Sequence, residues 1–175
     1  MSLLERSRAA LLVVDVQEGF RPAIEGFDRI VERCAILVRG ATVLDLEVLA
    51  TEQYPQGLKA TVAEIAEQLT APPLPKTVFS AARAEGFELP SEQVLVCGIE
   101  AHVCVSQTVH DLLDRGHEVH VAADATSSRT AQECERALSR MERAGATITT
   151  AEAALFELLG AAGTPEFKEV QRLIL

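Results

Sequence analysis

The chain has 175 residues, of which 48% are hydrophobic and 24% are charged, and its formal net charge is −10. These values are typical of one globular domain, residues 1–175, and they exclude a disordered segment. The acidic balance argues against a nucleic-acid or anionic-membrane partner, and no apolar stretch reaches the roughly 20 residues that cross a bilayer. Because no signal-peptide core follows the first residues, we expect a cytoplasmic protein.

Short apolar runs alternate with longer amphipathic segments along the chain. The runs predict strands at 10–14, 46–50, near 77–79, 94–99, 118–123 and 146–149. Helical spacing predicts helices at 27–44, 61–69, 104–115, 130–144, 151–159 and 165–174. Segment 51–59 is expected to be a loop, and a capping box at 61–64 is expected to open the second helix. This alternation predicts an α/β domain with a parallel sheet covered on both faces, in a three-layer, Rossmann-like architecture.

Cys104 follows the predicted strand 94–99 by one helical turn. The positive end of a helix dipole there favours the thiolate, which is the nucleophilic form of cysteine. The position is also at the carboxyl end of a strand, where open α/β sheets bind ligands. The other cysteines are expected to be core residues: Cys97 lies within a strand, and Cys34 and Cys134 lie on helices.

Asp15 and Lys76 are candidates that depend on context. Asp15 follows four aliphatic residues, so its carboxylate is either a partly desolvated general base or a cap of a turn. Lys76 precedes a short apolar run, a position that usually belongs to a solvated strand end. It becomes functional if the fold holds it near a carboxylate and a thiolate, where a fixed ammonium stabilises negative charge.

Three motifs in order resemble the isochorismatase-like cysteine hydrolases. They are Asp15-Val16-Gln17 after a strand, Lys76 before Thr77-Val78-Phe79-Ser80, and Gly98-Ile99-Glu100-Ala101-His102-Val103-Cys104-Val105 after a strand. Segments 51–58, 111–116 and 167–169 are similar, more narrowly, to the isochorismatase domain-containing proteins.

The resemblance implies a six-stranded parallel sheet in the order 3-2-1-4-5-6. It implies a catalytic triad of Asp15, Lys76 and Cys104. It also implies a cis peptide bond at Ile99–Glu100, with the backbone N–H groups of Glu100 and Cys104 forming an oxyanion hole. A homo-oligomer is expected on the same ground.

The implied reaction is hydrolysis of a C–N, amide-like bond of a small-molecule substrate through a thioester on Cys104. By their positions in loops, five residues are expected to form the substrate pocket: Phe20, Gln53, Tyr54, Phe79 and His102. Nicotinamidase-type members carry histidines that bind a divalent metal, whereas segment 51–55 has none. Neither a metal nor another cofactor is therefore expected.

Two alternatives remain open at the level of sequence. The chain could be a non-catalytic protein that binds a small molecule on the same fold, because the metal motif is missing. It could also be a thiol redox sensor that uses Cys104, with Cys97 or Cys134 as the resolving cysteine.

Overall fold

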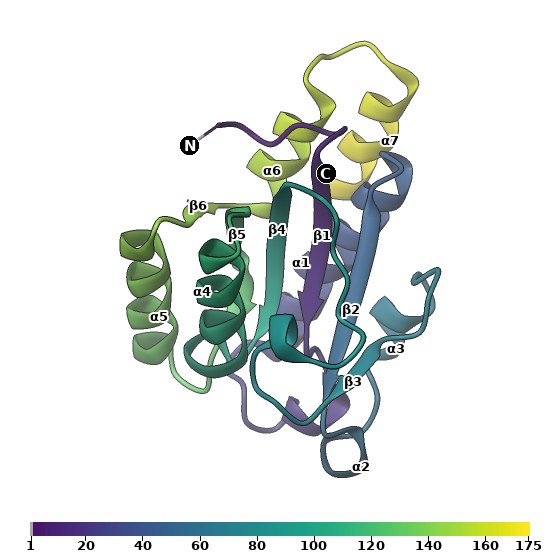
Figure 1. Ribbon diagram of the computed structural model, residues 1–175. Coiled ribbons are helices and arrows are strands. Elements are labelled where there is room, and N and C mark those ends of the chain that lie inside the picture. The colour runs from purple at the N-terminus through teal and green to yellow at the C-terminus, as the bar shows by residue number, and fades with distance from the viewer. Residues whose placement is uncertain (1) are drawn as a thin grey trace.

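The computed structural model describes residues 2–175, and a parallel sheet between two layers of helices forms its centre (Figure 1). The strand order is β3-β2-β1-β4-β5-β6, and every pairing is parallel. The predicted fold class and strand order are therefore confirmed. The strands are β1 (Ala9–Val14), β2 (Glu47–Gln53), β3 (Leu74–Lys76), β4 (Gln93–Ile99), β5 (Glu118–Ser127) and β6 (Thr147–Thr149).

Helices cover both faces of this sheet (Figure 1). One face carries α1 (Phe27–Val43), α3 (Ala63–Ala66), α6 (Ala151–Leu159) and α7 (Pro165–Ile174). The other face carries α4 (Ser106–Asp114) and α5 (Ala131–Ala144). Short helical turns complete the fold: η1 (Glu18–Phe20), α2 (Pro55–Leu58), η2 (Ala81–Arg83) and η3 (Ala101–Val105). Among residues 2–175, no helix combines the length and the apolar character that a membrane span requires.

The central strands are buried on both faces, which explains their unbroken apolar runs. Along β1, Leu11 and Val13 belong to the core beneath α1, whereas Leu12 and Val14 belong to the core beneath α4. Successive side chains of a strand point to opposite faces, so one continuous run supplies both cores.

Gly98 allows β1 and β4 to meet closely at their carboxyl ends. Its φ is +136°, and a Cβ atom built there would lie 2.1 Å from the carbonyl oxygen of Val14. A side chain at this position would therefore force the two strands apart. Because the strand order reverses between β1 and β4, this contact lies at the topological switch point of the sheet.

Several predicted boundaries were wrong where tertiary contacts decide them. The helix expected at 61–69 is reduced to α3, and Thr61 donates to the Glu52 carboxylate in place of capping it. The strand expected near 77–79 is β3, which contains Pro75; an edge strand tolerates proline because one side of its backbone needs no partner. Expected loop 51–59 contributes the end of β2 and then α2.

The segment that leads to Cys104 also differs from the expectation. Residues Ala101–Val105 form a π-helical turn, in which the N–H of Val105 donates to the carbonyl of Glu100 at 3.3 Å. The cis peptide expected at Ile99–Glu100 is not found, since the described residues 2–175 contain no cis bond. Glu100 changes the chain direction with a left-handed backbone, φ 60° and ψ 53°.

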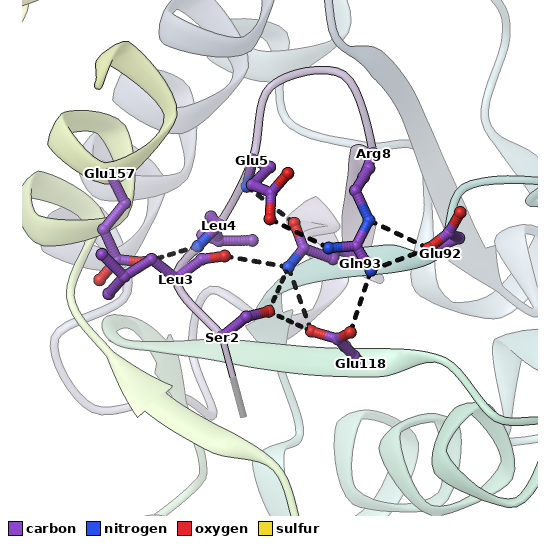
Figure 2. A network of polar contacts seen from close by, with 9 residues as sticks. All are labelled: Ser2, Leu3, Leu4, Glu5, Arg8, Glu92, Gln93, Glu118 and Glu157. Carbon is purple, nitrogen blue, oxygen red and sulfur yellow. Dashed lines mark hydrogen bonds and ion pairs between the residues drawn. The ribbon is translucent and has the colours of Figure 1, made fainter. Parts of the chain in front are cut away.

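A polar network closes the amino-terminal edge of the sheet (Figure 2). The Gln93 amide donates to the carbonyl of Leu3 and to the Glu118 carboxylate, and its oxygen accepts from the N–H of Glu5. Arg8 pairs with three carboxylates, those of Glu5, Glu92 and Glu118. The first residues are thereby tied to β4 and β5, at the edge opposite Asp15 and Cys104.

Candidate active site

Three neighbouring strands end in residues with a left-handed backbone. Asp15 follows β1, Tyr54 follows β2 and Glu100 follows β4, with φ angles of 55°, 38° and 60°. For residues other than glycine this conformation costs about 1–2 kcal/mol, so it persists only where the surroundings hold it. All three turns lie at the carboxyl edge of the sheet, which is the edge where open α/β sheets bind ligands.

Asp15 and Lys76 form a fully buried ion pair. Lys76 Nζ lies 2.7 Å from Asp15 Oδ2, and both side chains are 0% exposed. The other carboxylate oxygen of Asp15 accepts from the Thr51 hydroxyl at 2.7 Å. A buried charge needs such partners, because an unpaired one costs several kcal/mol. Of the alternatives for these two residues, the solvated strand end is therefore wrong for Lys76.

Gln53 and backbone carbonyls hold the ammonium of Lys76 in place, and Gln17 in turn holds Gln53. Lys76 also donates to Gln53 Oε1 at 2.7 Å and to the carbonyl of Phe79 at 2.9 Å. The Gln53 amide donates to the carbonyl of Thr77, and its backbone N–H donates to Gln17 Oε1. Gln53, which the sequence predicts as a pocket wall, is 7% exposed and acts in this structure as a partner of Lys76.

Cys104 lies in η3, on the same side of the sheet as Val14, and is 2% exposed. Burial raises the pKa of its thiol well above the ordinary range. The charge of Asp15 and a hydrogen bond to it raise that pKa further, whereas the charge of Lys76 lowers it. Burial and the charge of Asp15 thus oppose the helix dipole, which by itself favours the thiolate. The predicted triad of Asp15, Lys76 and Cys104 stays a prediction, of which the ion pair between Asp15 and Lys76 is observed.

Glu100 is the third charged group that affects Cys104, after Asp15 and Lys76. It is 4% exposed, and its carboxylate forms a two-point ion pair with Arg129, at 3.0 and 2.8 Å. The pair ties the start of η3 to the segment that follows β5. The charge of Glu100 also raises the pKa of Cys104. The predicted oxyanion hole, formed by the N–H groups of Glu100 and Cys104, stays a prediction.

The remaining predicted pocket residues lie in different surroundings. Tyr54 and Phe79 are 54% and 52% exposed at the rim of the site. Phe20 is partly buried against the core beneath α1. His102 Nδ1 lies 3.0 Å from the Ser128 hydroxyl, and the ring faces a cavity lined by α5. Tyr54 and Phe79 both lie near Lys76, because the N–H of Tyr54 donates to the carbonyl of Lys76 and the carbonyl of Phe79 accepts from its ammonium. His102 lies on the side of η3 that faces α5.

Three site residues were missed from the sequence: Gln17, Thr51 and Arg129. Thr51 and Gln53 are two residues apart at the end of β2, so their side chains point to the same face of the sheet. Because Gln53 was a predicted site residue, this spacing could also have identified Thr51. No pattern in the sequence indicates the Arg129–Glu100 pair.

The other cysteines lie away from the candidate site. Cys97 shares the core beneath α1 with Cys34, and the Cys134 thiol donates to the carbonyl of Thr126. Within residues 2–175, no group of three His, Cys, Asp or Glu side chains is arranged to hold a metal ion.

Comparison with known proteins agrees with this geometry. The isochorismatase domain family matches residues 9–153. "Isochorismatase domain-containing protein 2" of Macaca fascicularis is 48% identical over 169 residues, which cover 94% of this chain and 82% of that protein. Among solved structures, a protein described as the MAR1 ribonuclease of Caenorhabditis elegans superposes with a TM-score of 0.91 at 40% identity, covering 99% of this chain and 92% of that one.

A more distant solved structure shares the fold. The YcaC gene product of Escherichia coli, described as an octameric hydrolase of unknown specificity, has a TM-score of 0.88 at 22% identity. The match covers 99% of this chain and 91% of that one. At this identity the likeness supports the fold alone.

Proposed function

The chain belongs to the isochorismatase family, and we propose that it is a cysteine hydrolase that cleaves a C–N, amide-like bond of a small molecule. One observation carries the proposal: the carboxylate of Asp15 and the ammonium of Lys76 form a fully buried ion pair at the end of β1, the neighbour of the strand that leads to Cys104, which is itself buried. A structural protein has no need to bury these three groups together, because burial of charge is costly.

The proposed reaction begins with proton transfer from sulfur. Because the thiol is protonated at rest, Asp15 accepts its proton as Cys104 Sγ attacks the carbonyl carbon. The N–H groups of Glu100 and Cys104 donate to the oxyanion that forms. The tetrahedral intermediate then breaks its C–N bond, Asp15 returns the proton to the leaving amine, and a thioester remains. Water, deprotonated by Asp15, hydrolyses the thioester and releases a carboxylic acid and the thiol.

Access to the sulfur limits the substrate. Cys104 is 2% exposed, so either the substrate is small or segment 77–79 moves to admit it. Lys76 holds this segment through the carbonyl of Phe79. Phe20, Gln53, Tyr54, Phe79 and His102 remain the proposed substrate contacts, with Tyr54 and Phe79 at the entrance.

The proposal is tested with a panel of small amides, ureides and carbamoyl compounds. Wild type is compared with Cys104→Ala and Asp15→Asn, and Cys134→Ala is the control because Cys134 lies on α5. We expect turnover by wild type and by the control, none by Cys104→Ala, and an acyl adduct on Cys104 when the reaction is quenched in acid. Full turnover by Cys104→Ala would overturn covalent catalysis.

The alternative functions differ in measurable ways. A redox sensor needs a reactive thiolate and a resolving cysteine, whereas Cys104 has a raised pKa and Cys97 lies in the opposite core. Sulfenate trapping under peroxide should therefore give little adduct. A relative is described as a ribonuclease; because this chain has a net charge of −10, we place single-stranded RNA in the panel as an expected non-substrate. A non-catalytic binding protein would bind members of the panel without turnover.

We also propose a cytoplasmic homo-oligomer that takes neither a metal nor a cofactor. Three large apolar side chains, Tyr54, Val78 and Phe79, are exposed together around the carboxyl edge of the sheet. The distant E. coli relative is described as octameric. Sedimentation velocity tests the assembly, and a monomer at micromolar concentration would contradict it.

A further inference from the structure

A cavity of about 380 Å³ lies between α5 and the segment formed by η3 and the first residue of α4. Its lining comes from both elements: His102 and Ser106 on one side, and Gln132, Glu133, Arg136, Ala137 and Arg140 on the other. A volume of this size suits a small organic ligand. The proposed hydrolysis uses none of the α5 residues, and His102 is the one lining residue that is also a proposed substrate contact.

Arg136 and Arg140 give the cavity its chemistry. They lie one helical turn apart on α5 and line the same cavity. Within the described part of the chain, neither guanidinium has a carboxylate at ion-pairing distance. Both side chains are exposed, so a ligand in the cavity could reach them from solvent.

Arginines at helical spacing on α5 repel one another, and Glu133, three residues before Arg136, offsets part of that repulsion. Arg140 has one arginine four residues before it, Arg136, and another three residues after it, Arg143. Like charges at these spacings face each other and destabilise a helix. A dianion between Arg136 and Arg140 would remove the repulsion and could accept hydrogen bonds from both planar guanidinium groups.

The remaining lining favours an ester over a free inorganic ion. Ala137 forms a buried apolar floor between the two arginines, and the His102 ring forms the opposite wall. The one carboxylate, that of Glu133, lies 3.7 Å from His102 Nε2 and so faces the ring. The cavity therefore offers two cations for a phosphate and an apolar surface for the group that carries it.

We propose that this cavity is a second binding site, which takes a small phosphate monoester. The site is separate from the cysteine, because Cys104 does not line it. It is joined to the cysteine through η3, since His102 and Cys104 are two residues apart on one π-helical turn. Such turns are frequent at functional sites.

Calorimetric titration with phenyl phosphate tests the proposal. Wild type and Cys104→Ala should bind it with equal affinity, which makes the result independent of the proposed hydrolysis. Arg136→Gln/Arg140→Gln should raise the Kd at least about tenfold, because two charge-assisted contacts are lost. The control is Lys168→Gln/Arg172→Gln on α7, an exposed basic pair with the same spacing that lines another cavity, of about 350 Å³, and it should leave the Kd unchanged.

Each other outcome contradicts the proposal in a defined way. No saturable binding to wild type would remove the site, and an equal loss in the α7 control would show attraction by net charge alone. Equal affinity for benzoate would overturn the assignment of a dianion, and equal affinity for inorganic phosphate would overturn that of an ester. Tighter binding of a short oligoribonucleotide, lost in the α5 variant, would make the cavity part of a nucleic-acid site. If wild type does not bind phenyl phosphate and the α5 variant sediments at a lower mass than wild type, the arginines belong to a contact between copies of the chain.

Discussion

Lys76 Nζ lies 2.7 Å from Asp15 Oδ2 in a part of the protein that solvent does not reach. The two charges are therefore stable only as a pair. Removal of one leaves the other buried without compensation, whereas removal of both leaves neutral side chains that cost much less. The pair links β1 to the end of β3 across β2, so the same contact that prepares the site also closes this edge of the sheet.

We predict that Lys76→Met lowers the free energy of unfolding by about 3–5 kcal/mol. Asp15→Asn/Lys76→Met should lose less than the sum of the two single variants, because the double variant contains no unpaired charge. Urea denaturation of the four proteins measures both values. A loss below about 1 kcal/mol in Lys76→Met would contradict the burial of the pair.

The thiol of Cys104 should respond in opposite directions to loss of its two neighbours. Asp15 raises its pKa and Lys76 lowers it. At neutral pH, Asp15→Asn should therefore react with iodoacetamide about threefold faster or more, and Lys76→Met should react more slowly, since the thiolate is the reactive form. Mass spectrometry of the Cys104 peptide measures both rates.

The pH dependence of the same reaction carries a second expectation. In wild type the alkylation rate at Cys104 should still be rising at about pH 9, because the raised pKa lies above that value. The curve of Asp15→Asn should shift to lower pH. A plateau of the wild-type rate near neutral pH would show a resting thiolate and refute the raised pKa.

Gly98→Ala should destabilise the protein far more than Gly116→Ala. Both glycines have positive φ, so both substitutions carry a conformational cost of about 1–2 kcal/mol. At Gly116 no atom lies within 4 Å of the new Cβ, whereas at Gly98 the Val14 carbonyl oxygen lies 2.1 Å away. We expect a total loss of about 3 kcal/mol or more for Gly98→Ala, measured by urea denaturation. Equal losses would mean that the approach of β1 and β4 is not tight.

The network at the amino-terminal edge should make the free energy of unfolding depend on pH in the acidic range. Hydrogen bonds from Ser2, Gln93 and Arg8 lower the pKa of Glu118 from 4.5 to about 2. Its contribution to stability is thus complete above about pH 5 and is lost as the pH falls through about 2.

Thermal unfolding of Glu118→Gln and wild type checks this sign. The variant should have a lower Tm than wild type at about pH 6, and the difference should close as the pH falls through about 4 toward about 2. Glu47→Gln, an exposed carboxylate of β2, is the control and should show no such convergence. A difference in Tm that widens in acid would show that Glu118 has the opposite role.

The sequence was sufficient to predict the centre of the sheet. Strands β1 and β4 are buried on both faces, so their apolar runs are unbroken and leave no ambiguity. Edge strand β3 has three residues and contains Pro75, so only its pairing with β2 defines it. The last residues of β5 were missed because they are polar or small, and their pairing with β4 contains an irregularity of register.

The candidate site was predictable where resemblance supplied it and not where packing decided it. The resemblance predicted Asp15, Lys76 and Cys104, and the structure shows the first two as a buried ion pair. The partners of the site come from distant parts of the chain, as in Thr51 with Asp15 and Arg129 with Glu100. Only one influence on the pKa of Cys104, the helix dipole, can be inferred from sequence, whereas burial and a neighbouring carboxylate, which raise that pKa, depend on tertiary structure.

The left-handed turns that end β1, β2 and β4 have a consequence for how such a protein can diversify. They are conformations of the main chain, so the position of the site in the fold does not depend on which side chains occupy it. A few substitutions at these turns could therefore give a homologue a different reaction without a change of fold. We therefore expect paralogues of one shape to differ in their substrates, and similarity of shape to be a poor guide to which substrate each one takes.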